Sequence, residues 1–144
     1  MRFIFLDTSF LYPLPNPADQ LHQVAIKWRE VIWLQPRTTF LTTRSALIEF
    51  LGLTRRGDGS ARVAADPFVA DAISNDRIEV LVESTGLLTS ALNLSRARSD
   101  KAYSMADCLA MEVCRERKVL DVLTYDRGFV RDGFGALLCE DPGR

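Results

Sequence analysis

Two aspartates in this chain stand where carboxylates can act together. Asp7 directly follows an apolar run at residues 3–6, and Asp126 closely follows a second apolar run that ends at Leu123. If both runs are parallel strands, both carboxylates lie at the carboxyl edge of one sheet, where α/β domains bind ligands. An aspartate in such a place also commonly caps a helix or begins a turn, so the pair becomes informative only if further acids meet it.

Glu49 and Asp107 lie at the borders of the apolar faces of two predicted helices. At about 100° per residue, Glu49 falls beside Ala46, and Asp107 falls beside Cys114. Because acids are rarely buried unless they are paired or bind a metal, this placement predicts a partly buried acidic pocket. The ordinary alternatives are a solvated helix flank for Glu49 and a capping box with Ser104 for Asp107.

Four such carboxylates together favour a hard divalent cation. The chain has one histidine, His22, and its three cysteines are too far apart for Cys-x-x-Cys. It also lacks the Gly-rich phosphate-binding motifs and Gly-x-Ser-x-Gly. An all-carboxylate site suits Mg²⁺ or Mn²⁺, which would offset the repulsion among the acids, lower the pKa of a bound water and hold a phosphate. This chemistry fits hydrolysis of a phosphodiester bond.

The elements that would position these acids alternate along the chain. Strands are predicted at residues 2–6, 38–41, 77–82 and 119–123, with a short fifth at 136–139. Helices are predicted at 18–34, 43–54, 61–74 with Pro67 inside it, 84–98 and 104–117; a proline-rich loop is predicted at 12–17 and a turn at 57–60. This alternation predicts an α/β fold with a mainly parallel central sheet of about four to five strands flanked by helices. We expect one domain over residues 1–144.

Composition narrows the classes of protein further. A chain of 144 residues suits one domain, and 47% apolar with 26% charged residues is the balance of a globular protein. The net charge of −1 argues against binding nucleic acid through bulk charge alone. The odd, scattered cysteines favour a reducing, cytoplasmic setting. The apolar opening run ends at Asp7, too soon for a signal peptide or membrane helix, so no membrane partner is expected.

Four segments of the chain resemble PIN-domain ribonucleases. They are Leu6-Asp7-Thr8-Ser9 after the first strand, Ala46-Leu47-Ile48-Glu49, Asp100-Lys101-Ala102-Tyr103-Ser104-Met105-Ala106-Asp107-Cys108, and Thr124-Tyr125-Asp126-Arg127-Gly128-Phe129. Their order and their predicted elements match the family across nearly the whole chain. Within the family, the single-domain size is similar to that of VapC-type toxins of toxin–antitoxin modules.

The resemblance implies a Mg²⁺- or Mn²⁺-dependent endoribonuclease. Asp7 and Asp126 would be direct metal ligands, Glu49 and Asp107 would bind directly or through water, and Thr124 would orient the site. The products would carry a 3′-hydroxyl and a 5′-phosphate. The resemblance further implies an RNA substrate, a cognate antitoxin and a homodimer. One departure is Gly128, which stands where many relatives carry His before the Phe.

Other features have both a functional and an ordinary interpretation. Basic clusters that either guide RNA phosphates or merely form solvated faces are Arg55-Arg56 with Arg62, Arg96-Arg98-Lys101, and Arg115-Arg117-Lys118. Trp28 and Trp33 mark either a partner surface or the core, and Phe10 and Tyr12 lie near the predicted active edge. Two alternative functions stay open: RNA processing outside a toxin pair, and a catalytically silent module that binds RNA or protein.

Overall fold

The centre of the molecule is a parallel β-sheet. A computed structural model describes residues 1–57 and 59–142. Its described part contains five strands, hydrogen-bonded in the order β3-β2-β1-β4-β5. They are β1 (Arg2–Leu6), β2 (Thr38–Thr43), β3 (Ile78–Leu81), β4 (Asp121–Leu123) and β5 (Gly135–Ala136). The predicted α/β class with a parallel sheet is thus confirmed.

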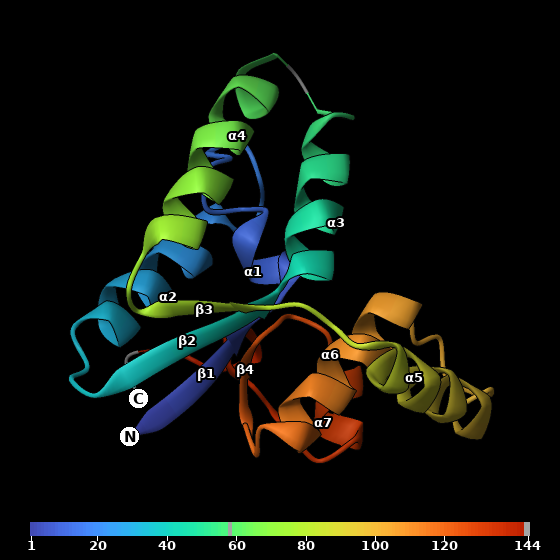
Figure 1. Cartoon of the computed structure of the whole chain (residues 1–144). Helices are drawn as coiled ribbons and strands as arrows, with labels where there is room; N and C mark the ends of the chain where they lie inside the picture. Colours follow the sequence, from blue (N-terminus) through green and yellow to red (C-terminus); the bar gives the residue numbers. More distant parts are fainter. Residues whose placement is uncertain (58, 143–144) are drawn as a thin grey trace.

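Helices cover both faces of this sheet. Figure 1 shows α1 to α4 above the sheet and α5 to α7 below it. Their bounds are α1 (Thr8–Leu11), α2 (His22–Trp33), α3 (Arg44–Thr54), α4 (Gly59–Ser74), α5 (Thr85–Ala97), α6 (Met105–Glu116) and α7 (Gly128–Arg131). In the part of the chain that the structure describes, every helix is too short or too polar to span a lipid bilayer.

The sheet is buried on both faces because alternate side chains of its central strands enter different cores. Ile4 and Leu6 of β1 pack in the core beneath α1 to α4, whereas Phe5 packs in the core against α5 and α6. Phe40 and Leu41 of β2 divide in the same way. A strand covered on both faces reads as a continuous apolar run, which is the pattern that predicted β1.

The helix starts follow local hydrogen bonding, and one of them corrects the prediction. Thr43 and Ser84 cap α3 and α5 through their hydroxyl groups instead of belonging to them. The helix predicted from residue 18 begins only at His22, because Asp19 Oδ1 accepts a 2.8 Å hydrogen bond from Leu21 N and closes a turn there. The predicted turn at 57–60 is shorter, since α4 starts at Gly59, and its Asp58 lies outside the described residues.

Two further differences concern short elements. The strand predicted at 136–139 is a strand only at Gly135–Ala136 and continues as a 3₁₀ turn, Leu137–Cys139. The four-residue helices α1 and α7 were not predicted, because one turn of helix leaves no periodic pattern in the sequence. Both short helices begin directly after the loops that carry Asp7 and Asp126.

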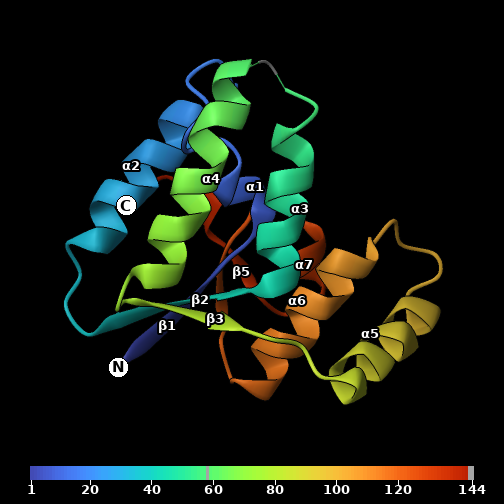
Figure 2. The same cartoon turned by 45° about the horizontal axis from the view of Figure 1, so that its top comes forward.

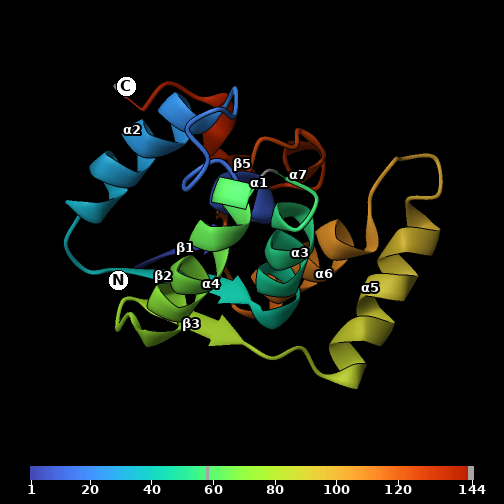
Figure 3. The ribbon, with the colours of Figure 1, turned by 90° about the horizontal axis from the view of Figure 1, so that it is seen from above.

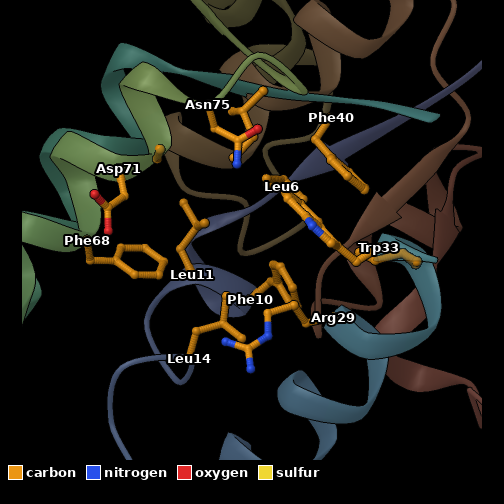
Figure 4. A pocket seen from close by; sticks show the side chains of 13 residues that line it. Leu6, Phe10, Leu11, Leu14, Arg29, Trp33, Phe40, Phe68, Asp71 and Asn75 are labelled. Atoms are coloured by element: carbon orange, nitrogen blue, oxygen red, sulfur yellow. The ribbon is translucent and has the colours of Figure 1, made fainter. Parts of the chain in front are cut away.

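An apolar cavity of about 220 Å³ lies between α2, α4 and the sheet. Figure 4 shows Phe10, Leu11 and Phe68 around it, with Arg29 and Asp71 near its margins. Trp33 stacks on Phe40 with ring centroids 5.0 Å apart and is 39% exposed, whereas Trp28 is buried. Trp28 is therefore a core residue, whereas Trp33 is an exposed one. None of the four candidate acids lines this cavity.

Candidate active site

The fold brings the four candidate acids to one pocket. Asp7 follows β1 and Asp126 follows β4, and these neighbouring strands flank the point where the strand order reverses. Glu49 lies on α3 and Asp107 lies in the first turn of α6. Figure 2 and Figure 3 show α1, α3 and α6 next to one another at this edge. The acidic pocket has a volume of about 290 Å³ and is lined by Asp7, Thr8, Ser9, Tyr12, Pro13, Asp19, Leu21, Glu49, Leu53, Asp107 and Asp126.

Asp7 is held by two hydroxyl groups. Its Oδ2 accepts hydrogen bonds of 2.8 Å from both Ser9 Oγ and Thr124 Oγ1. Thr124 is fully buried, and its hydroxyl oxygen also accepts a 3.1 Å hydrogen bond from Asp126 N. Burial raises the pKa of Asp7, while the hydrogen bonds from Thr124 and Ser9 lower it in part. Thr124 therefore links two of the acids across the sheet.

Asp107 caps the start of α6 and also lines the acidic pocket. Asp107 N donates to Ser104 Oγ and Asp107 Oδ2 accepts from Ser104 N, both at 3.1 Å, so the capping box is present. The same side chain lines the acidic pocket. Burial, with the negative charges of Asp7 and Asp126, raises the pKa of Asp107 to about 6 despite the bonds from Ser104. The capping interpretation is correct, and it does not remove the acid from the pocket.

Glu49 and Asp126 complete the set of acids that line the pocket. Glu49 is exposed on α3, yet partial burial of its carboxyl group and the charge of Asp7 raise its pKa. Asp126 Oδ1 accepts a 2.8 Å hydrogen bond from Gly128 N, at the start of α7. Glu49 is thus partly exposed, and Asp126 also accepts a local hydrogen bond. The sequence position of either acid alone therefore could not distinguish a functional residue from an ordinary surface or turn residue.

The carboxylate groups of the pocket are the type of ligand that a hard divalent cation binds. The pocket has only carboxylates as charged groups, and three of them have raised pKa values, so a bound cation would offset their mutual repulsion. Among the residues described, no three acidic, imidazole or thiol side chains stand close enough together to form a ready-made metal site. The chemistry of the donor set supports a metal, and the side chains would have to draw closer to bind it.

The structure adds residues that the sequence did not single out. Asp19 lines the acidic pocket as a fifth carboxylate, although the apolar spacing predicted a helix at its position. Its signal was the turn-forming sequence Asn16-Pro17-Ala18-Asp19, which favours a loop over a helix. Ser9 had no predicted role of its own, although a hydroxyl two positions after Asp7 is within reach of its carboxylate.

The three basic clusters differ in whether their charges are paired. Arg98 and Arg115 both bind Asp132, and Arg117 binds Glu79 with two hydrogen bonds of 2.8 Å. Lys101 lies 3.5 Å from Asp100. In contrast, Arg55 and Arg56, which directly follow α3, and Arg62 of α4 form no ion pair within the described part of the chain.

Comparison with known proteins agrees with this geometry. Residues 4–134 match the family model described as the PIN domain. The structure is similar to the crystal structure of VapC20 of Mycobacterium tuberculosis, a toxin that cleaves the sarcin–ricin loop. That match has a TM-score of 0.78 and 26% identity, and it covers 93% of this chain and 98% of the other. A comparison with curated proteins found no match. The resemblance seen in the sequence is confirmed: this chain belongs to the PIN-domain family.

Proposed function

We propose that this chain, as one nuclease domain, is a metal-dependent endoribonuclease and the toxin of a toxin–antitoxin module. The proposal rests mainly on the acidic pocket. The four acids of the PIN-like motifs line it together, at the edge of the sheet where the strand order reverses between β1 and β4. The similarity to VapC20, a toxin that cleaves an RNA loop, supports RNA as the substrate and toxicity as the role.

In this proposal Asp7, Glu49, Asp107 and Asp126 hold Mg²⁺ or Mn²⁺. The cation supplies a bound water of lowered pKa and charge stabilisation for the phosphate. Hydrolysis of the phosphodiester bond then leaves a 3′-hydroxyl and a 5′-phosphate.

The chain's own groups orient this chemistry. Ser9 and Thr124 fix the rotation of the Asp7 carboxylate through two hydrogen bonds to Oδ2. Thr124 also fixes the backbone of Asp126, so a single buried hydroxyl sets the relative position of two acids. The capping box with Ser104 holds Asp107 at the start of α6, so its carboxylate stays at the wall of the acidic pocket.

The proposed partners follow from the same likeness. We propose a cognate antitoxin that inhibits the enzyme, a homodimer, and a cytoplasmic location. The three cysteines are free, as is usual for proteins of a reducing compartment.

RNA cleavage mapping tests the enzymatic part of the proposal. Wild type is expected to cut RNA with Mn²⁺ or Mg²⁺ and to lose cleavage in EDTA, and Asp107→Asn is expected to be inactive. The matched control is Asp66→Asn, an exposed aspartate of α4 that does not line the acidic pocket. Cleavage retained in EDTA or in Asp107→Asn would contradict the proposal, and the absence of both cleavage and metal binding would favour a silent binding module.

Expression in bacteria tests the toxin part. Wild type is expected to arrest growth, and co-expression of an antitoxin encoded beside the gene is expected to restore it. Asp107→Asn is expected to be harmless. RNA cleavage without growth arrest would instead favour an RNA-processing enzyme of the same family.

A further inference from the structure

A second hollow adjoins the acidic pocket. This side pocket has a volume of about 210 Å³ and is lined by Tyr12, Asn16, Ala18, Asp19, Gly57 and Ala61. It shares Tyr12 and Asp19 with the acidic pocket, so these two residues border both hollows. We infer that the side pocket is a base-binding subsite, which holds the base of a single-stranded RNA next to the cleaved phosphodiester. This inference rests on the proposed ribonuclease function.

Tyr12 supplies an aromatic surface at the junction of the two pockets. It caps the C-terminal end of α1, and its side chain extends to the loop between α3 and α4. There its hydroxyl lies 3.9 Å from the point that a Cβ at Gly57 would occupy. Asn16 Nδ2 donates a 2.7 Å hydrogen bond to Tyr12 O, which fixes the backbone of the loop at Tyr12. Aromatic rings in such grooves stack on unpaired bases of single strands.

Small residues keep the side pocket open. Ala18, Gly57 and Ala61 form half of its lining. A Cβ added at Gly57 would lie 3.2 Å from Ala61 Cβ, closer than ordinary contact, so a larger residue there would narrow the pocket. The side pocket therefore stays wide enough beside Tyr12 only while these three positions carry small side chains.

Asp19 determines which part of a nucleotide enters the side pocket. Its Oδ1 accepts a 2.8 Å hydrogen bond from Leu21 N, which fixes the carboxylate at the pocket wall. An ionised carboxylate only accepts hydrogen bonds and repels phosphate. The side pocket therefore takes the base, and Asp19 favours a base that presents an amino group, as carboxylates do when they accept from cytosine N4.

The flanking phosphate has a cationic partner beyond the side pocket. Arg55 and Arg56 precede Gly57, and Arg62 follows Ala61, so all three adjoin its lining. The three side chains are exposed, and the described residues offer them no ion pair. A strand whose base enters the side pocket would thus place its next phosphate toward these arginines, which form no ion pair with the described residues.

Binding of labelled single-stranded RNA of random sequence to the inactive Asp107→Asn protein tests the stacking. Tyr12→Leu keeps an apolar side chain but removes the aromatic face, so binding is expected to weaken by about 5- to 150-fold, whereas Tyr12→Phe is expected to bind like the parent protein. Equal affinity of Tyr12→Leu and Tyr12→Phe would overturn the role of the ring.

Salt dependence tests the binding of phosphate separately from folding. Arg55→Gln with Arg56→Gln is expected to reduce the slope of log affinity against log salt by about 0.7 for each phosphate that the arginines neutralise. The matched control is Lys27→Gln with Arg29→Gln, which removes two cations from α2, outside both pockets. An unchanged slope in the first pair would overturn the role of these arginines.

Base preference tests Asp19 and separates the two proposals. Cleavage mapping on RNA of random sequence is expected to show that Asp19→Asn prefers amino-bearing bases over uracil less strongly than wild type at one position beside the cut. An identical base profile would overturn the role of Asp19. If wild type cuts no RNA, the proposed function fails; if it cuts RNA and all these variants match their controls, only the subsite fails.

Discussion

Thr124 Oγ1 donates a 2.8 Å hydrogen bond to Asp7 Oδ2 and joins residues 117 positions apart in the chain. The contact spans two neighbouring strands, since Leu6 of β1 lies opposite Leu123 of β4 in the parallel ladder. The same hydroxyl oxygen accepts from Asp126 N. One buried side chain therefore couples the rotation of one acid to the backbone of another.

Thr124→Val tests this coupling because it keeps the shape and removes the hydroxyl. Without the donor, the pKa of Asp7, already raised by burial, is expected to rise further. A hydrogen bond to a charged group contributes about 1.5–3 kcal/mol, so kcat is expected to fall about 10- to 150-fold. The acid limb of the pH–rate profile should move to higher pH, and Thr124→Ser should restore both. A wild-type pH profile in Thr124→Val would contradict the orienting role.

The raised pKa values predict how the metal-free protein responds to pH. Between the ordinary pKa of Asp107, 3.8, and its folded value of about 6, the folded state binds more protons than the unfolded state. The free energy of unfolding contributed by this group is therefore largest at low pH and is lost as pH rises through about 6. Asp7 and Glu49 act in the same direction.

Thermal unfolding in EDTA measures this effect. After a discount for solvent screening, the raised pKa of Asp107 lowers the free energy of unfolding at neutral pH by about 1 kcal/mol. For a chain of this size, this corresponds to about 2–4 °C in Tm. Asp107→Asn keeps an acceptor for Ser104 N and is expected to melt higher than wild type by this amount at neutral pH. Identical pH dependence in the two proteins would show that the charge of Asp107 does not oppose folding.

A divalent cation should offset the loss of stability that the ionised acids of the pocket cause at neutral pH. At a free Mg²⁺ concentration about 100 times its Kd, the folded state gains about 2.7 kcal/mol. The resulting rise in Tm is expected to be larger at neutral pH than near pH 5, because protons and the cation compete for the same carboxylates. Asp126→Asn should lose most of the rise, whereas Asp66→Asn should retain it. An equal rise in both variants would place the cation outside the acidic pocket.

The sequence predicted elements whose signals are local. The apolar run of β1 and the Ser104–Asp107 capping box are signals of this kind, and both elements start and end within one residue of their expected bounds. Asp19 was missed because the residues around it indicate a turn but do not indicate which other segments that turn lies against. Only folding brings this side chain beside Asp7 and Glu49.

The ion pairs of the arginines also could not be predicted from the local sequence. The arginine clusters are similar in sequence, yet Arg117 is neutralised by Glu79, 38 positions away, and Arg98 by Asp132, 34 positions away. Composition within a few residues contains no information about such partners. The structure thus separates Arg55, Arg56 and Arg62, which form no ion pair with the described residues, from arginines such as Arg98 and Arg117, which do.

Gly128 provides the last prediction, because a side chain there would meet Tyr103. A Cβ at Gly128 would lie 2.7 Å from Tyr103 Cε1 and 3.0 Å from Asp126 Oδ1, while Tyr103 Oη donates a 3.0 Å hydrogen bond to Gly128 O. Tyr103 thus occupies the space that a side chain at position 128 would need. Gly128→Ala is expected to destabilise the protein by about 1–3 kcal/mol through overpacking.

Chemical denaturation checks this value against a glycine that has room. Gly52 of α3 has no atom within 4 Å of an added Cβ, so Gly52→Ala is expected to stabilise the protein by about 0.4–1 kcal/mol. Combining Gly128→Ala with Tyr103→Ala should cost less than the sum of the two single changes, because the second removes the ring that the first displaces. Strict additivity would show that Tyr103 does not restrict position 128, and that another contact, such as the one to Asp126, keeps glycine there.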